Sequence, residues 1–283
     1  MIAFHAQPMY DAIADEQSRT HGRYGLPLQV QFCKRCVISN QRPNSAPEYA
    51  HTAQSMKRTI NFTEGVCDAC RVAEAKKATC WKDRERQLRA LCDEYRSPSG
   101  AYDCIVPGSG GKDSFYAAHM LKTQYGMHPL TVTWAPHLYT EWGYRNWTRW
   151  LAAGFDNYLV TPNPQTHRLL TRLAVENLFH PFQPFVIGQK ALAPKMAKLF
   201  NVPLVFYGEN EAEYGNPIGD TLNAKRDPSY YASEDAHLSG VPIAELKSRF
   251  KLNDSDLAPY MPADDFAQVH YLGYYLKWHP QGA

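Results

Sequence analysis

The stretch "IVPGSGGKDS", residues Ile105 to Ser114, decides the fold expected for this chain, because an apolar run there meets a loop of glycines and polar residues. The preceding "YDCIVP" (102–107) favours a strand, and "FYAAHMLKTQYG" (115–126) has apolar residues at helical spacing and ends on glycine. The loop therefore joins a strand to a helix N-terminus. Unpaired N–H groups and the helix dipole favour an anion at such a position, so the stretch predicts a phosphate-binding loop.

Spacing excludes two familiar phosphate loops and fits a third. A Walker A loop needs glycine where this chain has Val106 and serine or threonine where it has Asp113, and a dinucleotide fingerprint needs glycine at that same aspartate. The six residues from Ser109 to Ser114, SGGKDS, resemble instead the SGGxDS signature of the PP-loop ATP pyrophosphatases, which split ATP into AMP and pyrophosphate. The alternative is a glycine-rich turn in an ordinary α/β unit.

Composition places limits on the protein class. The 283 residues are enough to bury a core in one or two domains, and 30 Lys+Arg against 28 Asp+Glu leave a net charge of +2. This balance gives no support for a nucleic-acid-binding surface. No apolar stretch approaches the length of a membrane span, and the N-terminus lacks the basic and apolar regions of a signal peptide. We therefore expect a cytoplasmic protein.

Four of the seven cysteines form two C-x2-C pairs, in "FCKRCVIS" and "GVCDACRV". An odd total and this pairing favour thiolate ligands over disulfides. Two tight turns would close a tetrahedral site with no open position, which predicts a structural zinc ion in a zinc-ribbon module. A redox pair or an iron–sulfur cluster are the alternatives. The predicted ligands are Cys33, Cys36, Cys67 and Cys70, and the cysteines expected to be buried side chains are Cys80, Cys92 and Cys104.

From residue 102 onward, predicted strands and helices alternate, which is typical of an α/β fold. We expect a doubly wound, mostly parallel sheet with ligands bound beyond the carboxyl ends of its strands. Further strands are expected at 129–135, 157–162, 184–188 and 203–210, and helices at 144–154, 165–179, 189–201 and 241–252.

The predicted organisation has five parts. They are an N-terminal extension (1–30), the zinc-ribbon module (31–80), a linker helix (81–97), the PP-loop ATP-binding domain (98–213) and a substrate or lid region (214–283). The last part ends soon after the aromatic run "YLGYYLKWHPQ", so we expect it to be truncated at its C-terminal end.

The chain as a whole resembles the bacterial N-acetyl sugar amidotransferases, PP-loop enzymes of lipopolysaccharide O-antigen and nonulosonic-acid biosynthesis. The resemblance covers most of 31–280 and is carried by "CKRCV", "GVCDAC", "PGSGGKDS", "TVTWAPH", "GQKALAPKMA" and "VFYGENEAEYGNP". Two features depart from the family: its members continue past "YLGYYLKWHPQ", and the loop between the cysteine pairs is longer here.

The resemblance implies conversion of a sugar acetamido group into an acetamidino group. ATP would adenylylate the amide oxygen and release pyrophosphate, and ammonia would then displace AMP. The implied cofactors are ATP, Mg²⁺ and structural Zn²⁺. The implied partners are an N-acetylated, nucleotide-linked sugar and a glutaminase subunit that supplies ammonia.

Individual residues receive expected roles on this basis. Asp113 would orient the loop or Mg²⁺, Lys190 would reach the leaving phosphates, and Glu209 would bind a metal or polar substrate; these three are the expected catalytic residues. The simpler alternatives are a helix-start carboxylate at Asp113 and a solvated lysine at Lys190. Expected nucleotide contacts are Ser109, Gly110, Gly111, Lys112, Asp113, Ser114, Thr133, Trp134, Gly188, Lys195, Gly208 and Asn210.

Other side chains are weighed against plainer roles. Thr133 and Trp134 would line an adenine pocket, with core packing as the equal alternative. The histidines His119, His167 and His180 lie beside apolar residues, and structural roles are expected for them.

Two other functions remain open from the sequence. A PP-loop tRNA sulfurtransferase would activate a base carbonyl in the same way but deliver sulfur; the near-zero net charge counts against RNA binding. A nucleotide-binding adaptor without chemistry is the non-enzyme alternative.

Overall fold

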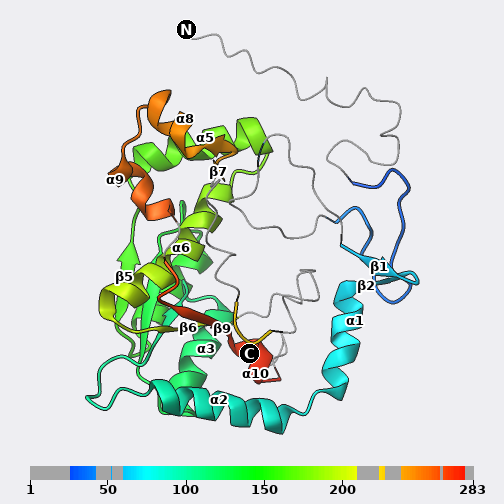
Figure 1. Ribbon diagram of the computed structural model, residues 1–283, viewed down its shortest axis with the longest axis vertical. Helices are drawn as coiled ribbons and strands as arrows, with labels where there is room; N and C mark the ends of the chain where they lie inside the picture. The colour runs from blue at the N-terminus through cyan, green and yellow to red at the C-terminus, as the bar shows by residue number, and fades with distance from the viewer. Residues whose placement is uncertain are drawn as a thin grey trace.

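A five-stranded parallel sheet organises the chain. The computed structural model describes residues 26–42, 52, 60–208, 223–226, 237–261 and 264–277. The strand order is β5-β4-β3-β6-β9, and helices flank the sheet (Figure 1). The α/β class expected from the alternating pattern is confirmed.

The sheet reverses its winding direction at β3. Its strands are β3 (Cys104–Pro107), β4 (Pro129–Trp134), β5 (Asn157–Val160), β6 (Leu204–Tyr207) and β9 (Gln268–Tyr271). From β3 the chain first winds outward through β4 and β5, and then returns to place β6 and β9 on the other side of β3. The β3–β6 boundary is therefore a topological switch point, where open α/β sheets bind ligands.

One face of the sheet is covered by α5 (Pro164–Leu178) and α6 (Gln183–Phe200). Ile105 and Val205 point to this side and pack with Ile187 and Leu170 in one buried cluster. Shorter elements extend the layer: α8 (Ile243–Ser248), α9 (Asp254–Leu257) and η7 (Ala258–Tyr260). A small hairpin, β7 (His237–Leu238) and β8 (Val241–Pro242), precedes them.

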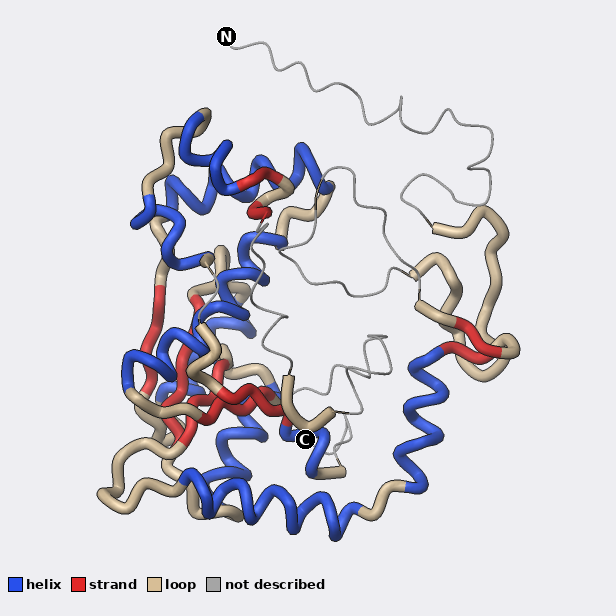
Figure 2. Tube along the Cα trace, in the orientation of Figure 1, coloured by secondary structure: helices blue, strands red, loops and turns tan. Residues whose placement is uncertain are grey.

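The other face is covered by α2 (Trp81–Tyr95), α3 (Lys112–Thr123), α4 (Glu141–Leu151) and α10 (Leu272–Tyr275). Because side chains alternate along a strand, Val106 and Phe206 point to this side, where Leu121 and Trp150 join them in a second buried cluster. Figure 2 shows the strands of the sheet gathered between the helices.

A separate small module precedes the sheet. It consists of β1 (Phe62–Thr63), β2 (Val66–Cys67), α1 (Asp68–Ala75) and η4 (Lys76–Ala78), with a core that includes Ile60 and two cysteines. From this module the chain runs through α1 into α2, which lies along the base of the sheet in Figure 1. The guanidinium carbon of Arg84 on α2 lies 3.6 Å from the ring centroid of Tyr274 on α10 and helps to attach the two helices.

The predicted strand at 184–188 is wrong, because these residues form the first turns of α6. Pro184 stands in the first turn, where a missing N–H costs nothing, and Ile187 and Gly188 are buried on the sheet. A short apolar run does not distinguish a buried strand from a buried helix. The helix expected at 241–252 is also shorter, since β8 takes its first residues and α8 ends at Ser248. In the described residues, no helix is both long and apolar enough to cross a membrane.

Gly188→Ala should destabilise the fold. A Cβ at this position would lie 2.3 Å from the indole Cζ2 of Trp134, so we expect a loss of about 1–3 kcal/mol in the free energy of unfolding. Urea denaturation measures it. In a Trp134→Leu background the alanine Cβ has more room, so Gly188→Ala should lower the free energy of unfolding by less. An equal loss of unfolding free energy in both backgrounds would contradict the contact between Gly188 and Trp134.

Candidate phosphate-binding site and cysteine cluster

The SGGKDS loop lies at the switch point of the sheet. Gly108 follows β3, Gly111 immediately precedes α3, and Gly208 follows β6. Since β3 and β6 are parallel neighbours, their carboxyl ends open at the same edge. The loop therefore occupies the position at which this sheet architecture binds ligands.

Two glycines allow backbone segments to touch around the loop. Gly110 has φ +85°, and a Cβ there would lie 2.3 Å from the carbonyl oxygen of Asn146 on α4. A Cβ on Gly208 would lie 2.2 Å from the carbonyl oxygen of Asp113. Both positions exclude a side chain, because real Cβ atoms do not approach other atoms this closely. The loop is thereby held between α4 and the end of β6.

Backbone donors at the loop are open. Within the described residues, no acceptor contacts the N–H groups of Ser109, Gly110 and Gly111, and no side chain caps α3. The position of a Gly111 Cβ has no atom within 4 Å. Open N–H groups at a helix N-terminus, with free space in front, favour an anion such as a phosphate.

The polar side chains of the loop lie beside these donors. Lys112 Nζ is 2.5 Å from Asp113 Oδ1, and the Asp113 side chain keeps 20% of its surface exposed. Ser114 Oγ donates a hydrogen bond of 3.1 Å to the Gly111 carbonyl. Asp113 is therefore paired with Lys112 and still accessible, and accessibility is what contact with a phosphate-bound cation requires.

A pocket of about 190 Å³ adjoins the loop. The sequence analysis did not find it, because the β4–α4 connection that forms it was given no role; the only signal was the mixed apolar and polar "APHLYT" after a strand. The hydroxyl of Tyr139 in this pocket is buried and has no partner among the described residues. The lining residues are Ser109, Gly111, Pro136, Leu138, Tyr139, Thr140, Gly143 and Asn146.

Thr133 and Trp134 support the loop from within the core. Thr133 Oγ1 donates to the Gly108 carbonyl at 2.6 Å and accepts from Asn157 Nδ2 at 3.0 Å. Thr133 is 1% exposed and Trp134 is 4% exposed, with its ring against Gly188. The core-packing alternative therefore describes Trp134, and Thr133 fixes the start of the loop.

The lysines of α6 occupy two different environments. Lys195 Nζ donates to the Ala258 carbonyl on η7, and burial lowers its pKa to about 8. In this structure the Lys195 side chain therefore extends toward η7. Lys190 is half-buried, less than one turn after Gly188. The expected site residues Glu209 and Asn210 lie outside the described residues.

The four paired cysteines gather in the N-terminal module. Cys33 Sγ lies 3.9 Å from Cys70 Sγ, Cys36 Sγ lies 3.7 Å from Cys67 Sγ, and all four sulfurs lie within 4.8 Å of one another. Sulfurs at roughly 2.3 Å from a tetrahedral zinc ion would be roughly 3.8 Å apart. The donor set and its spacing fit zinc.

Backbone N–H groups stabilise the thiolate form of one cysteine in this cluster. The Cys67 and Arg35 N–H groups point at Cys33 Sγ at 3.4 and 3.3 Å, and they lower the pKa of the Cys33 thiol to about 6. Desolvation raises the pKa of Cys67 and Cys70 instead, so a cation is needed to hold all four sulfurs deprotonated.

The second cysteine pair differs from the expected tight turn. Cys67 ends β2 and Cys70 lies in the first turn of α1, so a helix N-terminus holds this pair. The positive end of a helix dipole favours thiolates, and a two-residue spacer fits a first helical turn as well as a loop.

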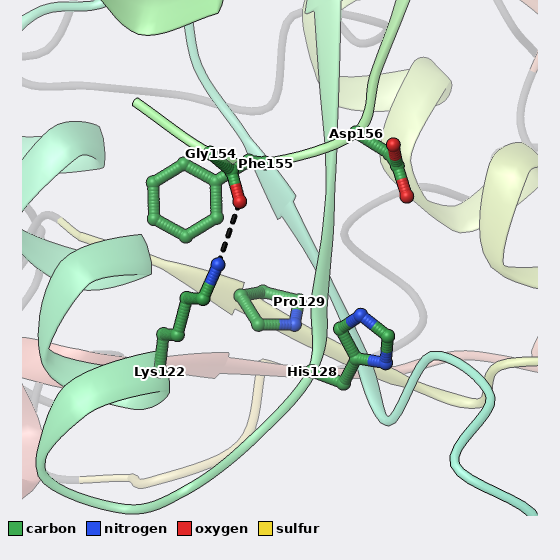
Figure 3. Close-up of a pocket in the computed structure, with 6 residues that line it drawn as sticks. All are labelled: Lys122, His128, Pro129, Gly154, Phe155 and Asp156. Atoms are coloured by element: carbon green, nitrogen blue, oxygen red, sulfur yellow. Dashed lines mark hydrogen bonds between the residues drawn. The ribbon is translucent and has the colours of Figure 1, made fainter. Parts of the chain in front are cut away.

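A second pocket, of about 290 Å³, lies at the opposite edge of the sheet, where Pro129 begins β4 and Asp156 precedes β5 (Figure 3). Its charges already have protein partners. Lys122 Nζ donates to the Gly154 carbonyl at 2.6 Å, and Asp156 accepts from the Tyr102 hydroxyl at 2.7 Å. This pocket does not share residues with the SGGKDS loop.

No protein-family model and no curated protein sequence matches the chain. Any assignment of function therefore rests on the geometry above and on the sequence motifs.

Cys67→Ser should abolish zinc binding and unfold the N-terminal module, because a closed tetrahedral site couples metal binding to folding. Zinc content by plasma mass spectrometry and proteolysis of the module measure the two effects. Cys80→Ser is the matched control, since Cys80 is exposed and outside the cluster. A Cys67→Ser chain that keeps its zinc and resists proteolysis would exclude this ligand set.

Proposed function

We propose that this chain is an ATP-dependent amidotransferase of the PP-loop type, which converts an acetamido group on a nucleotide-linked sugar into an acetamidino group. The observation that carries the nucleotide part is the set of open N–H groups of Ser109, Gly110 and Gly111 at the switch point of the sheet. The sugar part rests on the sequence resemblance.

The loop and its pocket suit ATP. The N–H groups of the loop, with the Ser109 and Ser114 hydroxyls, would hold the β- and γ-phosphates, which the helix dipole of α3 also attracts. The adjoining pocket, with Tyr139 in its wall, would take the nucleoside. Asp113 would hold Mg²⁺, which supplies charge neutralisation for the departing pyrophosphate.

The chemistry explains why ATP is needed. An amide carbon is a poor electrophile and its oxygen a poor leaving group. Attack of the amide oxygen on the α-phosphorus of ATP releases pyrophosphate and leaves the oxygen bonded to AMP. Ammonia then bonds to the activated carbon, and the carbon–oxygen bond breaks with AMP as the leaving group. The product is the amidine.

The environments of the cysteines favour nitrogen over sulfur transfer. Four cysteines are gathered in the candidate metal cluster. Burial raises the pKa of Cys92 to about 12 and that of Cys104 well above its ordinary value, so neither is a ready thiolate. Cys80 is exposed but stands alone. A sulfurtransferase that relays sulfur through a cysteine pair has no accessible pair here outside the metal cluster.

Asp113→Asn should lower sugar-dependent pyrophosphate release by about a hundredfold or more, because a neutral amide loses the charge that holds a phosphate-bound cation. The substitution is nearly isosteric, so circular dichroism should be unchanged. The matched control is Asp83→Asn, an exposed aspartate on α2 that pairs with Arg86. If Asp113→Asn released pyrophosphate at a rate close to that of the control, Asp113 would have no role in holding the cation and would act only as a carboxylate at the start of α3.

Ammonium salts, but not glutamine alone, should support the reaction. Glutamine hydrolysis commonly needs a nucleophilic cysteine with a partnered base, and the cysteine environments above leave no such pair. A separate glutaminase subunit is therefore the proposed donor in the cell.

Mass spectrometry of a panel of N-acetylated nucleotide sugars, incubated with ATP, Mg²⁺ and either nitrogen source, tests both proposals. Replacement of an oxygen by an NH group, with AMP and pyrophosphate formed, is the expected result with ammonium. Equal product with glutamine alone would contradict the separate donor. No nucleotide-dependent change in any sugar would contradict the amidotransferase.

A further inference from the structure

Three side chains form a hydrogen-bonded row that leads from the β4–α4 connection into the interior of the fold. His137 Nε2 lies 3.0 Å from His167 Nε2, and His167 Nδ1 lies 2.6 Å from the Tyr260 hydroxyl. His167 is 6% exposed and Tyr260 is fully buried. The sequence predicted a structural histidine at 167, and the structure adds that its second ring nitrogen holds another histidine.

His137 itself is exposed and firmly oriented. Its ring stacks on His167, with centroids 4.2 Å apart, and lies 5.0 Å from the Phe185 ring on α6. Among the described residues, its Nδ1 has no hydrogen-bond partner. The imidazole is therefore held at Nε2, while Nδ1 has no partner among the described residues. In this arrangement a base is oriented by a second group, which is itself oriented by a third.

The position of His137 brings it to the edge of the sheet where the phosphate-binding loop lies. Its neighbours Pro136 and Leu138 line the pocket beside Ser109 and Gly111. His167 lies in the first turns of α5, which begins after β5 at the same edge.

We propose that His137 is the base that takes a proton from the attacking ammonia, with His167 and Tyr260 as positioning residues. This inference rests on the proposed amidotransferase function and names a group for its second step. Both contacts allow either direction of donation, and this role requires one tautomer: His137 Nε2–H donates to His167 Nε2, and His167 Nδ1–H donates to the Tyr260 hydroxyl. His137 Nδ1 then carries the free lone pair.

The step balances as follows. Adenylylation of the amide oxygen leaves the carbon double-bonded to the original nitrogen, which keeps its proton and carries a positive charge. The lone pair of ammonia forms a bond to this carbon, and the π pair of the carbon–nitrogen double bond moves onto the original nitrogen and neutralises it. The new nitrogen then carries the positive charge. His137 Nδ1 takes one proton from that nitrogen. The lone pair so released forms the carbon–nitrogen double bond, and the carbon–oxygen bond breaks with its electrons leaving on AMP. His137 returns the proton to solvent.

The surroundings keep both histidines neutral near pH 7. His137 is exposed, but packing against His167 and Phe185 partly desolvates its ring, which lowers its pKa below the ordinary value. Burial, together with the neighbouring His137, lowers the pKa of His167 to about 4. Among the described residues, the titratable groups that contact the pair are each other and Tyr260. On α9, Asp256 accepts from Thr166, the residue before His167. A neutral His137 is the form that can accept a proton.

The test compares two steps of one reaction in His137→Gln, with His119→Gln as the matched control because His119 is exposed on α3. In single-turnover experiments, His137→Gln should keep its pyrophosphate burst but form amidine about a hundredfold more slowly at fixed ammonia. The rise of the wild-type rate with pH through the His137 pKa should disappear in the variant.

Three results would overturn the inference. They are an unchanged amidine rate in His137→Gln, loss of the pyrophosphate burst together with amidine formation, and a proton on Nδ1 of neutral His137 in ¹⁵N NMR of the unsubstituted full chain. Absence of pyrophosphate release from the unsubstituted chain with every sugar is a separate result, since it contradicts the proposed function before His137 is tested.

Discussion

The contact of backbone with backbone at the ends of β3 and β6 is the constraint on which the rest of the site depends. Gly208 meets the carbonyl of Asp113, and Gly110 meets the carbonyl of Asn146, so α3, α4 and β6 converge on one short loop. Within the described residues, the N–H groups of Ser109 to Gly111 have no hydrogen-bond acceptor, and a Cβ on Gly111 would meet no atom within 4 Å. Under the proposed function, anion binding at this edge would depend on packing as much as on charge, because the helix dipole acts only where a ligand can approach.

Buried polar groups hold that geometry from below. Thr133 fixes the Gly108 carbonyl, Asn157 donates to both Thr133 and Thr131, and Thr131 donates in turn to the Asp156 carbonyl. Hydrogen bonds of this kind are costly to break inside a core, since the partner left behind is unsatisfied. Strand β4 therefore positions the start of the loop that follows β3, through the hydrogen bond from Thr133 to the Gly108 carbonyl.

Sequence reasoning reached the parts of this molecule that depend on local pattern. The strand before the SGGKDS loop, the helix after it and the pairing of Cys33, Cys36, Cys67 and Cys70 are all visible as periodicity or spacing. It failed at 184–188, where burial on the sheet makes helix and strand look alike. The nucleotide contact expected of Lys195 stays a prediction. Its hydrogen bond to the Ala258 carbonyl, 63 residues away, is not predictable from the helix alone. The hydrogen bond between His137 and His167 was not predicted either, because it joins segments that are 30 residues apart.

The placement of β9 and α10 has a consequence for how the chain is made. β9 closes one edge of the sheet beside β6, and α10 packs with Leu88 and Cys92 of α2. The packing around residues near 90 is therefore complete only when residues near 275 have been synthesised. During synthesis the cysteine module, α2 and β3 to β5 emerge early. The apolar surface that α10 covers stays exposed until the residues of α10 leave the ribosome. Such long-range closure slows folding and exposes apolar surface in the interval. The last described residues of the chain therefore complete the packing of its early helix α2.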